Sequence, residues 1–347
     1  MIAIERTNTQ WIEHVHGGVG ACLKEFFADK RRHMADLSQS SLKLLDAVED
    51  LTDRGGKRLR PVVLYAGARA VNGDPDYATL WRAGAALELL QTYLLIHDDW
   101  MDQDNERRGG KAVHVHFAET THDTHLGASL AVLAGDLASA YAWELMSTCL
   151  ANSPAQPKLL ALFARIHQEV VMGQHQDLLN EGGIDSIYDL KTGSYTVRGP
   201  LLLGGIIGGA SETQLDSLQA LAKPLGIAFQ LRDDLLGTFG DAATLGKPVG
   251  NDLRRGKFTA IIVEANATLN PDGLALLRKV MNDRDATHDA VMAAVNVLEQ
   301  SGIHTRMDQR VTTLAAEAKE LLGQVPIDDT GRALLTELID RLTDRDR

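Results

Sequence analysis

The chain has 347 residues, 44% of them apolar, and a formal net charge of −12 with a pI of about 5.4. This composition is that of a globular protein long enough to bury a large core. The acidic balance argues against a nucleic-acid surface or a basic membrane patch, since both need clustered Lys and Arg. It does not exclude an anionic substrate, because bound metal ions reverse the local charge.

The cysteines and the N-terminal segment bear on localisation. Cys22 and Cys149 lack metal-ligand or redox spacing, which fits a reducing compartment. Residues 1–18 carry charged and polar groups where a secretory signal has an apolar core. The most apolar run, at 199–210, is rich in glycine and shorter than the roughly 18 to 20 residues of a spanning helix. We therefore expect a cytoplasmic protein without stable membrane insertion.

Apolar residues recur at spacings of three and four along nearly the whole chain, without a period-two run bounded by turns. This pattern predicts an all-α fold with one domain, 1–347, whose first residues, about 1–20, form a loosely ordered segment. Clusters of Gly, Pro and Asn indicate the loops. The expected helices span about 36–54, 76–103, 126–150, 154–181, 214–239, 257–268, 272–282, 286–301, 304–323 and 329–344.

The stretch 87–108, LELLQTYLLIHDDWMDQDNERR, is predicted to be an apolar helix that ends in carboxylates and two arginines. Asp98 and Asp102 share a helix face at a spacing of four residues, and Asp99 lies close by. Such a cluster needs either open solvent or a divalent cation, because partly buried like charges repel. Carboxylate oxygens suit Mg²⁺, which keeps several waters and takes its other ligands from substrate phosphates.

A second acidic cluster follows in GIAFQLRDDLLGTFGD, where Asp233 and Asp234 end another apolar run and Gln230 lies one turn earlier. Either cluster alone is more often a solvated helix end than a metal site. Two of them on apolar helices favour a metal site, since helical bundles build such sites from side chains on facing helices.

Cationic residues alternate with these acids. The segment 53–61, DRGGKRLRP, contains a glycine pair that lets a ligand approach the backbone. Its lysine and arginines are donors suited to phosphate oxygens. The adjacent Arg107 and Arg108 point in different directions and could hold two phosphate groups. Further polar residues along the chain are Asp177, Lys191, Thr192, Lys247 and Lys257. Each lysine alone is most simply a solvated charge. Together with the acidic clusters, however, these residues predict a cavity for two diphosphates around Mg²⁺.

Seven motifs occur in one order along the chain: GGKRLRP (55–61), DDWMDQDNERRGG (98–110), GD (135–136), GQHQDL (173–178), KTGSYT (191–196), FQLRDD (229–234) and GKPVGNDLRRGK (246–257). In this order they resemble the trans-isoprenyl diphosphate synthase, or polyprenyl synthase, family over nearly the whole length. A lone DDxxD motif would be a weak signal, whereas seven ordered motifs are specific. The resemblance implies a helical bundle of the isoprenoid synthase type with a central active-site cavity, and a homodimer.

The resemblance also assigns roles to single residues. It implies about three Mg²⁺ ions, with Mn²⁺ as a substitute, bound by oxygen ligands. The metal ligands would be Asp98, Asp99, Asp102, Asp177, Asp233 and Asp234. Catalysis would rest on Asp98, Asp99, Asp102, Lys191 and Asp233. Isopentenyl diphosphate would contact Gly56, Lys57, Arg60, Gln91 and Arg108, and the allylic diphosphate would contact Arg107, Lys191, Thr192, Gln230, Lys247 and Lys257.

The implied reaction lengthens an allylic diphosphate by one isopentenyl unit. Metal ions and cations stabilise the departing diphosphate, so that the C–O bond ionises to an allylic carbocation. The double bond of isopentenyl diphosphate attacks this cation, and a proton is lost, in this family to the released diphosphate. A dry apolar pocket protects the cation from water, which explains why the acids follow an apolar helix.

Three positions depart from the commonest family pattern. Gly237 stands where many members have a third aspartate, Gln91 often corresponds to His, and GGKAVH replaces the usual G-x-P-T-V-H. The change at Gly237 puts the strength of the second metal site in doubt. Gln91 still offers an amide donor for a phosphate oxygen.

Product length in the family depends on residues upstream of the first aspartate, which here are Tyr93 and Leu94. One bulky ring beside a smaller neighbour predicts a short all-trans product, geranylgeranyl diphosphate (C20), with farnesyl diphosphate (C15) as the alternative. A plain core aromatic is an equally good interpretation of a single tyrosine.

Three other functions compete with elongation. A class I terpene cyclase shares the DDxxD motif but needs no isopentenyl diphosphate site, so GGKRLRP and FQLRDD disfavour it. A non-catalytic subunit of a heteromeric synthase would tend to lose the acidic motifs, which are intact here. A metal phosphohydrolase would need further spaced His ligands beside His97.

Overall fold

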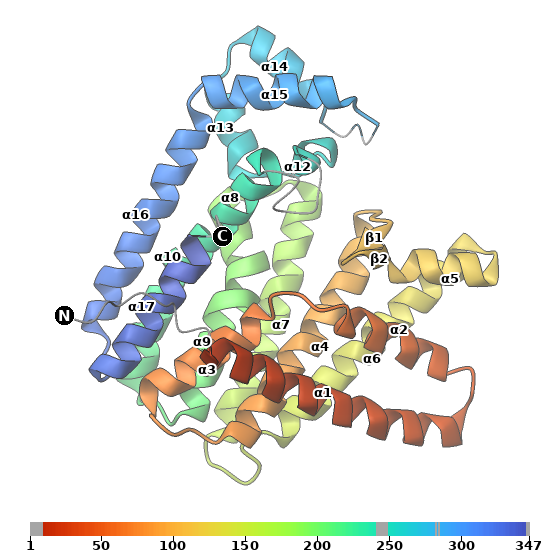
Figure 1. Ribbon diagram of the computed structural model, residues 1–347, viewed down its shortest axis with the longest axis vertical. Coiled ribbons are helices and arrows are strands. Elements are labelled where there is room, and N and C mark those ends of the chain that lie inside the picture. Colours follow the sequence, from red (N-terminus) through yellow and green to blue (C-terminus); the bar gives the residue numbers. More distant parts are fainter. Residues whose placement is uncertain (1–9, 241–248, 282, 284, 345–347) are drawn as a thin grey trace. The chain divides into compact units, whose positions relative to one another are not determined.

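The structure is a computed structural model that describes residues 10–240, 249–281, 283 and 285–344. This part of the chain is largely helical (Figure 1), which confirms the predicted all-α class. Its only regular strands are β1 (Glu106–Arg107) and β2 (Gly110–Lys111), which pair antiparallel. The chain divides into two compact units: unit 1 comprises Met1–Phe163 and Leu203–Gly209, and unit 2 comprises Ala164–Leu202 and Ala210–Arg347.

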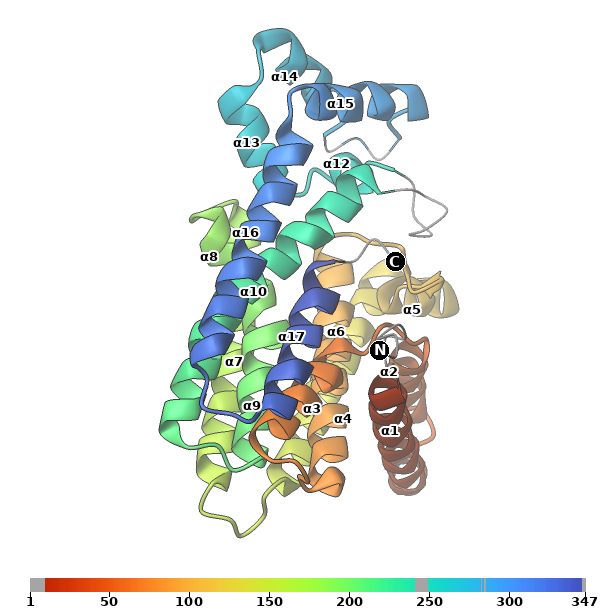
Figure 2. The same ribbon diagram turned by 60° about the vertical axis from the view of Figure 1, so that its left-hand side comes forward.

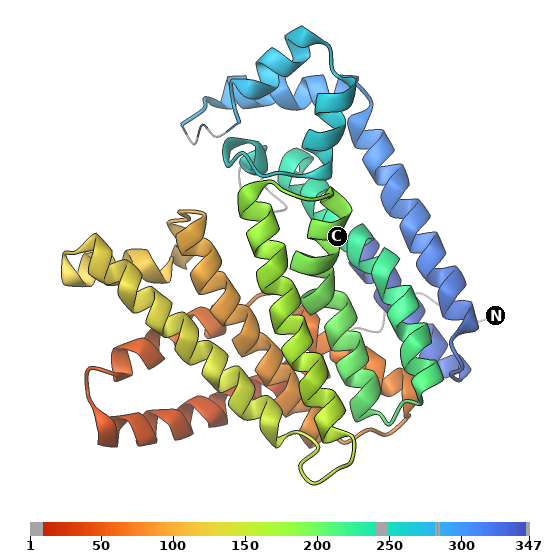
Figure 3. The same ribbon diagram turned by 180° about the vertical axis from the view of Figure 1, so that it is seen from behind.

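Unit 1 is arranged around α4 (Tyr77–Met101), in which Leu87, Leu89 and Leu90 are fully buried. Apolar residues on all sides are typical of a helix enclosed by others. Asp76 caps the helix by accepting a 3.0 Å hydrogen bond from the Ala78 N–H. Figure 3 shows α6 running beside α4, and both belong to a set of helices that comprises α1 (Gln10–Leu37), α2 (Leu42–Asp53), α3 (Leu59–Val71), α4 (Tyr77–Met101), α5 (Val113–Thr121) and α6 (Thr124–Thr148).

Unit 2 is arranged around α10 (Glu212–Phe239), which begins with a capping box between Ser211 and Gln214. Figure 2 shows α16 running along α10, and their buried apolar side chains share one core cluster with the neighbouring helices. The other elements are α8 (Ile184–Ile187), the π-helix η1 (Tyr188–Arg198), α12 (Asn251–Arg254), α13 (Ala260–Thr268), α14 (Pro271–Arg278), α15 (His288–Gln300), α16 (Ile303–Gln324) and α17 (Asp329–Thr343). Residues of both units contribute to α7 (Gln156–Leu179) and α9 (Gly199–Ile207).

The N-terminal part of the chain differs from the expectation. Residues 10–20, which were expected to be loosely ordered, form the first turns of α1, and residues 1–9 lie outside the described part. Val15 and Val19 are fully buried there. At Gly18 a Cβ atom would lie 2.4 Å from the Trp81 ring, so glycine allows α1 to approach α4 closely. Gly18 in this segment therefore serves the packing of α1 on α4 and does not indicate a loop.

One described helix, α6, is long and apolar enough to span a membrane by length and composition alone. The apolar run at 199–210 contains the shorter helix α9. Core helices of soluble proteins pass the same test, and α6 packs against α4, α5 and α2. Its composition is therefore weak evidence for a span.

Candidate active site

The first acidic cluster lies at the C-terminal end of α4. Asp98 and Asp99 occupy its last turn and Asp102 is its C-cap. The Asp98 side chain is 25% exposed, whereas that of Asp99 is fully buried. The chain turns away at Gln103, which has a φ of 54°, and the Asp104 N–H donates to the Asp99 carbonyl at 2.7 Å. Two carboxylates four residues apart are thereby left partly accessible at the helix end.

Arg107 lies among these acids because the β1–β2 hairpin returns it towards α4. Its Nε donates to Asp99 Oδ1 at 2.7 Å, and its Nη2 lies 3.2 Å from Asp104 Oδ2 and 3.8 Å from Asp98 Oδ2. Burial opposes the charge of the guanidinium, but the bonds to Asp99 and the neighbouring carboxylates outweigh it and raise the pKa of Arg107. Asp99 is thus the counter-ion of Arg107. Asp104, which sequence reasoning did not select, is a further partner.

The donor set at the end of α4 fits Mg²⁺. Asp98 and Asp102 offer hard oxygen atoms on one helix face, and a single arginine offsets only part of the charge of the four carboxylates. No group of three or more His, Cys, Asp and Glu side chains in the described residues forms a metal site by itself. Since Mg²⁺ commonly takes one or two carboxylates together with phosphate oxygens, the arrangement suits an ion that binds with a diphosphate.

A group of arginines in unit 1 surrounds a buried acid, Glu88 of α4. Glu88 is 3% exposed, and one of its oxygens, Oε1, has no hydrogen-bond partner among the residues that the structure describes. Burial raises the pKa of Glu88, while the charges of Arg60, Arg108 and Arg58 act in the opposite direction. Burial and the neighbouring arginines lower the pKa of Arg108. Glu88 is therefore an electrostatic partner of Arg60, Arg108 and Arg58. Sequence reasoning missed it, although it lies within the stretch 87–108.

The residues predicted to bind isopentenyl diphosphate occupy different environments within unit 1. A Cβ atom at Gly56, where φ is 128°, would lie 3.1 Å from Arg108 Nη2, so the guanidinium rests against bare backbone. Lys57 is exposed, Gln91 is partly buried and Arg60 is buried. The structure therefore brings Gly56, Arg60 and Arg108 into one cationic region.

The predicted chain-length floor lies on the same helix as the first acidic cluster. Tyr93 and Leu94 are both partly buried. The Tyr93 ring meets His97 edge to face at 4.8 Å between centroids. His97 in turn rests on α6, where a Cβ atom at Gly135 would lie 2.2 Å from its Nε2. Tyr93 is thus supported by the close packing of α4 on α6.

In unit 2, η1 carries Lys191 and Thr192 past α7. Lys191 Nζ donates to Asp177 Oδ2 at 2.5 Å. A Cβ atom at Gly173 would lie 2.3 Å from the Lys191 backbone nitrogen, so only glycine permits this contact between α7 and η1. This explains why the motifs GQHQDL and KTGSYT belong together. Thr192 is partly exposed, and Lys247 lies outside the described residues.

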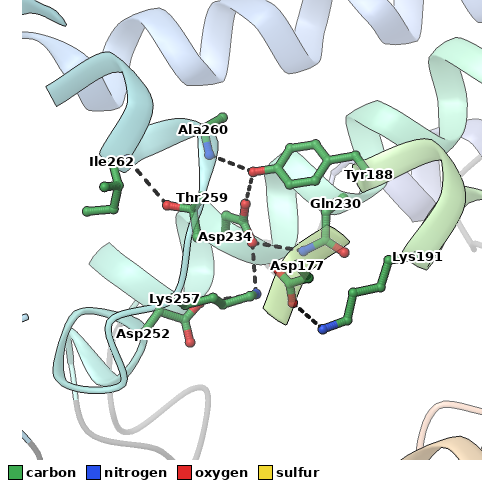
Figure 4. A network of polar contacts seen from close by, with 10 residues as sticks. All are labelled: Asp177, Tyr188, Lys191, Gln230, Asp234, Asp252, Lys257, Thr259, Ala260 and Ile262. Atoms are coloured by element: carbon green, nitrogen blue, oxygen red, sulfur yellow. Dashed lines mark hydrogen bonds and ion pairs between the residues drawn. The ribbon is translucent and has the colours of Figure 1, made fainter. Parts of the chain in front are cut away.

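The second acidic cluster contains one exposed and one buried carboxylate. Asp233 is exposed, whereas Asp234 is fully buried. Asp234 Oδ1 accepts hydrogen bonds from Gln230 Nε2 at 2.8 Å and Lys257 Nζ at 3.0 Å, and Oδ2 accepts one from the Tyr188 hydroxyl (Figure 4). Both oxygens of Asp234 are thus engaged by protein donors, unlike those of an open metal ligand. Asp233 is the better candidate of the two for that role.

Asp252, on α12, occupies the space beside Gly237. A Cβ atom at Gly237 would lie 2.2 Å from Asp252 Oδ2, so a side chain there would require Asp252 to move. Asp252 Oδ2 is also 3.6 Å from Lys257 Nζ. Burial opposes the charge of Lys257, but Asp234, Asp252 and Asp233 outweigh it and hold the pKa of Lys257 well above its usual value. A carboxylate from a different element therefore lies where the motif lacks its third aspartate.

Comparisons with known proteins agree with these arrangements. A family model described as Polyprenyl synthetase matches residues 42–298. A short chain isoprenyl diphosphate synthase of Methanocaldococcus jannaschii is 34% identical over 75% of this chain and 77% of its own. A geranylgeranyl diphosphate synthase of Sulfolobus acidocaldarius is 33% identical over 74% of this chain and 77% of its own.

Among solved structures, a geranylgeranyl pyrophosphate synthase of Corynebacterium glutamicum, complexed with isoprenyl diphosphate and magnesium, is similar with a TM-score of 0.87 and 30% identity. The match covers 97% of this chain and 99% of that one. This likeness confirms the isoprenoid synthase type of fold. The chain belongs to the polyprenyl synthetase family, as its ordered motifs had predicted.

Proposed function

We propose that the protein is a Mg²⁺-dependent trans-prenyltransferase that condenses isopentenyl diphosphate with an allylic diphosphate to give geranylgeranyl diphosphate. The observation that carries this proposal is the end of α4, where Asp98 and Asp102 stay accessible while Asp99 is buried against Arg107. The names of the related synthases support the same reaction. Farnesyl diphosphate remains the alternative product.

Bound Mg²⁺ would stabilise the negative charge that develops on the departing diphosphate. In unit 1, Asp98 and Asp102 would hold such ions, and Asp99 would keep Arg107 in place as a donor to phosphate oxygens. In unit 2, Asp233 would be the exposed metal ligand, and Lys191, Gln230 and Lys257 would offer donors to a diphosphate. We retain about three Mg²⁺ ions, with Mn²⁺ as a substitute, as the expected stoichiometry.

The arginines of unit 1 would bind isopentenyl diphosphate. Glu88 offsets part of the charge of Arg58, Arg60 and Arg108 when no substrate is bound. A diphosphate carries more negative charge than one carboxylate, so these guanidiniums still favour an anion. Arg108, beside the backbone of Gly56, would contact it directly.

We also propose that the enzyme is a cytoplasmic homodimer. Leu126 and Leu133 lie two helical turns apart on α6 and are 43% and 52% exposed, which supports a protein partner on this helix.

The two cysteines bear on the proposed cytoplasmic location. Cys22 and Cys149 are both free. Burial raises the pKa of Cys149 to about 12, so its thiol stays protonated and inert.

A product assay tests the proposed reaction. Purified protein is given Mg²⁺, isopentenyl diphosphate and either the C5, C10 or C15 allylic diphosphate, and the chain lengths of the products are measured by mass spectrometry. We expect elongation that stops at C20 in the wild type. We expect longer products from Tyr93→Ala, because removal of the ring that packs on His97 would leave room at the predicted chain-length floor.

The other outcomes of this assay are decisive as well. A halt at C15 would make the protein a farnesyl diphosphate synthase. An unchanged product distribution in Tyr93→Ala would place the chain-length floor elsewhere. Failure to elongate any starter would overturn the proposed function in favour of a class I terpene cyclase, which would release a cyclic product, or a non-catalytic subunit, which would release none.

A further inference from the structure

Tyr188 is a buried tyrosine at the start of η1 that no sequence motif singles out. It is 4% exposed, and its hydroxyl lies between two partners (Figure 4). The hydroxyl donates to Asp234 Oδ2 and accepts a 2.7 Å hydrogen bond from the backbone N–H of Ala260. Ala260 is the first residue of α13, so its N–H has no acceptor within that helix. One hydroxyl therefore connects η1, α10 and α13.

Asp234 depends on this hydroxyl for its orientation. Gln230 Nε2 and Lys257 Nζ both bind Oδ1, and Tyr188 is the side-chain donor that the described structure places on Oδ2. The terminal torsion of an aspartate has a broad energy minimum, so donors on one oxygen alone leave the plane of the carboxylate free to turn. A donor on each oxygen fixes that plane, and in a fully buried group neither oxygen can turn to water instead.

The orientation of Asp234 in turn determines where two donors, Lys257 and Gln230, lie. Lys257 has a long, flexible side chain, and within the described part of the chain it lies 3.0 Å from Asp234 Oδ1 and 3.6 Å from Asp252 Oδ2. If Asp234 turned, Lys257 would lose the shorter contact and move towards Asp252. Gln230 would lose its 2.8 Å bond in the same movement.

We propose that Tyr188 is a positioning residue for diphosphate binding in unit 2, because its hydroxyl holds Asp234 in the orientation that fixes Lys257 and Gln230. The inference deepens the proposed function and rests on it in one respect, namely that Lys257 and Gln230 bind a diphosphate. Tyr188 itself acts only through Asp234 and touches no substrate.

The test replaces the hydroxyl and keeps the ring. For Tyr188→Phe we expect the dissociation constant of inorganic pyrophosphate, measured by calorimetry in excess Mg²⁺, to rise about tenfold. We expect a similar rise in KM for the allylic diphosphate and a change in kcat below about threefold, as for lost ground-state binding. The matched control is Tyr141→Phe on α6, which removes the hydroxyl of another buried tyrosine, 6% exposed, whose oxygen contacts Met34 Sδ at 3.2 Å. It should leave pyrophosphate affinity and KM unchanged.

A double-mutant cycle separates action through Asp234 from an independent effect. Asp234→Asn should weaken pyrophosphate binding, and adding Tyr188→Phe should weaken it by less than about twofold more. Multiplication of the two single effects would overturn the proposal, as would unaltered affinity in Tyr188→Phe. Loss of folding in Tyr188→Phe but not in Tyr141→Phe would assign the hydroxyl to stability and overturn it too.

The pyrophosphate measurement also keeps this proposal distinct from the proposed function. A wild-type protein that binds pyrophosphate with Mg²⁺ but forms no prenyl diphosphate would refute the proposed reaction alone. The positioning role would then still be decided by the affinity of Tyr188→Phe.

Discussion

Asp98 and Asp99 are neighbours in the sequence, yet their side chains meet different surroundings. Asp99 is fully buried and binds the guanidinium of Arg107, whereas Asp98 is 25% exposed. Asp99→Ala should therefore lower the free energy of unfolding by about 2–3 kcal/mol, because a buried charge loses its main partner. Asp98→Ala should lower it by less than about 1 kcal/mol. Urea denaturation measures both free energies. Asp102→Ala, which removes a second accessible carboxylate, serves as a further comparison.

Asp98→Ala and Asp99→Ala should differ less in catalytic activity than in their free energies of unfolding. Asp98→Ala should lower kcat/KM by about a hundredfold or more, because charge stabilisation at the leaving group is lost. Equal destabilisation by Asp98→Ala and Asp99→Ala would contradict the distinction between an accessible ligand and a buried counter-ion.

At the scale of single residues, the sequence points to candidate metal ligands more readily than to the residues that support them. Asp98, Asp102 and Asp233 are predicted as ligands because paired acids at the end of an apolar helix form a local pattern. Glu88 and Tyr188 were not found, because their roles depend on partners far along the chain, as with the bond between Tyr188 and Asp234. A sequence motif shows only the spacing of neighbouring residues, whereas such supporting contacts join residues that are far apart in the chain.

Among the elements, η1 is one whose position depends directly on a glycine. A Cβ atom at Gly173 would lie 2.3 Å from the Lys191 backbone nitrogen. Gly173→Ala should therefore destabilise the protein by about 1–3 kcal/mol, since backbone cannot give way as a flexible side chain does. It should also weaken pyrophosphate binding by displacing Lys191 from Asp177.

Gly323→Ala is the matched control for Gly173→Ala. Gly323 lies in α16 with no atom within 4 Å of an added Cβ, so alanine should stabilise the helix by about 0.5–1 kcal/mol. Thermal unfolding of both variants gives the comparison. A neutral Gly173→Ala with an unchanged pyrophosphate affinity would show that η1 tolerates displacement from α7.

The sequence predicted the long helices well and the short or unusual ones poorly. The helix expected at about 214–239 is α10 (Glu212–Phe239), since its apolar repeat is long and Ser211 marks its start. Seven of the described helices were not expected, namely α1, α3, α5, α8, η1, α9 and α12, and α1 is the long helix among them. Glycine interrupts the pattern of α9, and the wider turn of a π-helix shifts the apolar spacing on which helix prediction depends.

For the whole molecule, an acidic chain that binds anions needs local positive charge. The formal net charge of −12 repels a diphosphate at long range, and it is offset only near clusters such as Arg58, Arg60 and Arg108 or by bound cations. Mg²⁺ and pyrophosphate should therefore bind cooperatively, each favouring the other.

This cooperativity should be visible in the stability of the intact protein. Ligands that bind only the folded state add about 2.7 kcal/mol at a hundredfold excess over the dissociation constant. For a chain of this length, that should raise the melting temperature by about 4 °C. We expect the increase with Mg²⁺ and pyrophosphate together and a much smaller one with either alone. Addition of EDTA should abolish it, and Asp98→Ala should reduce it. A full increase with pyrophosphate in EDTA would mean that the cationic side chains bind the anion without a metal.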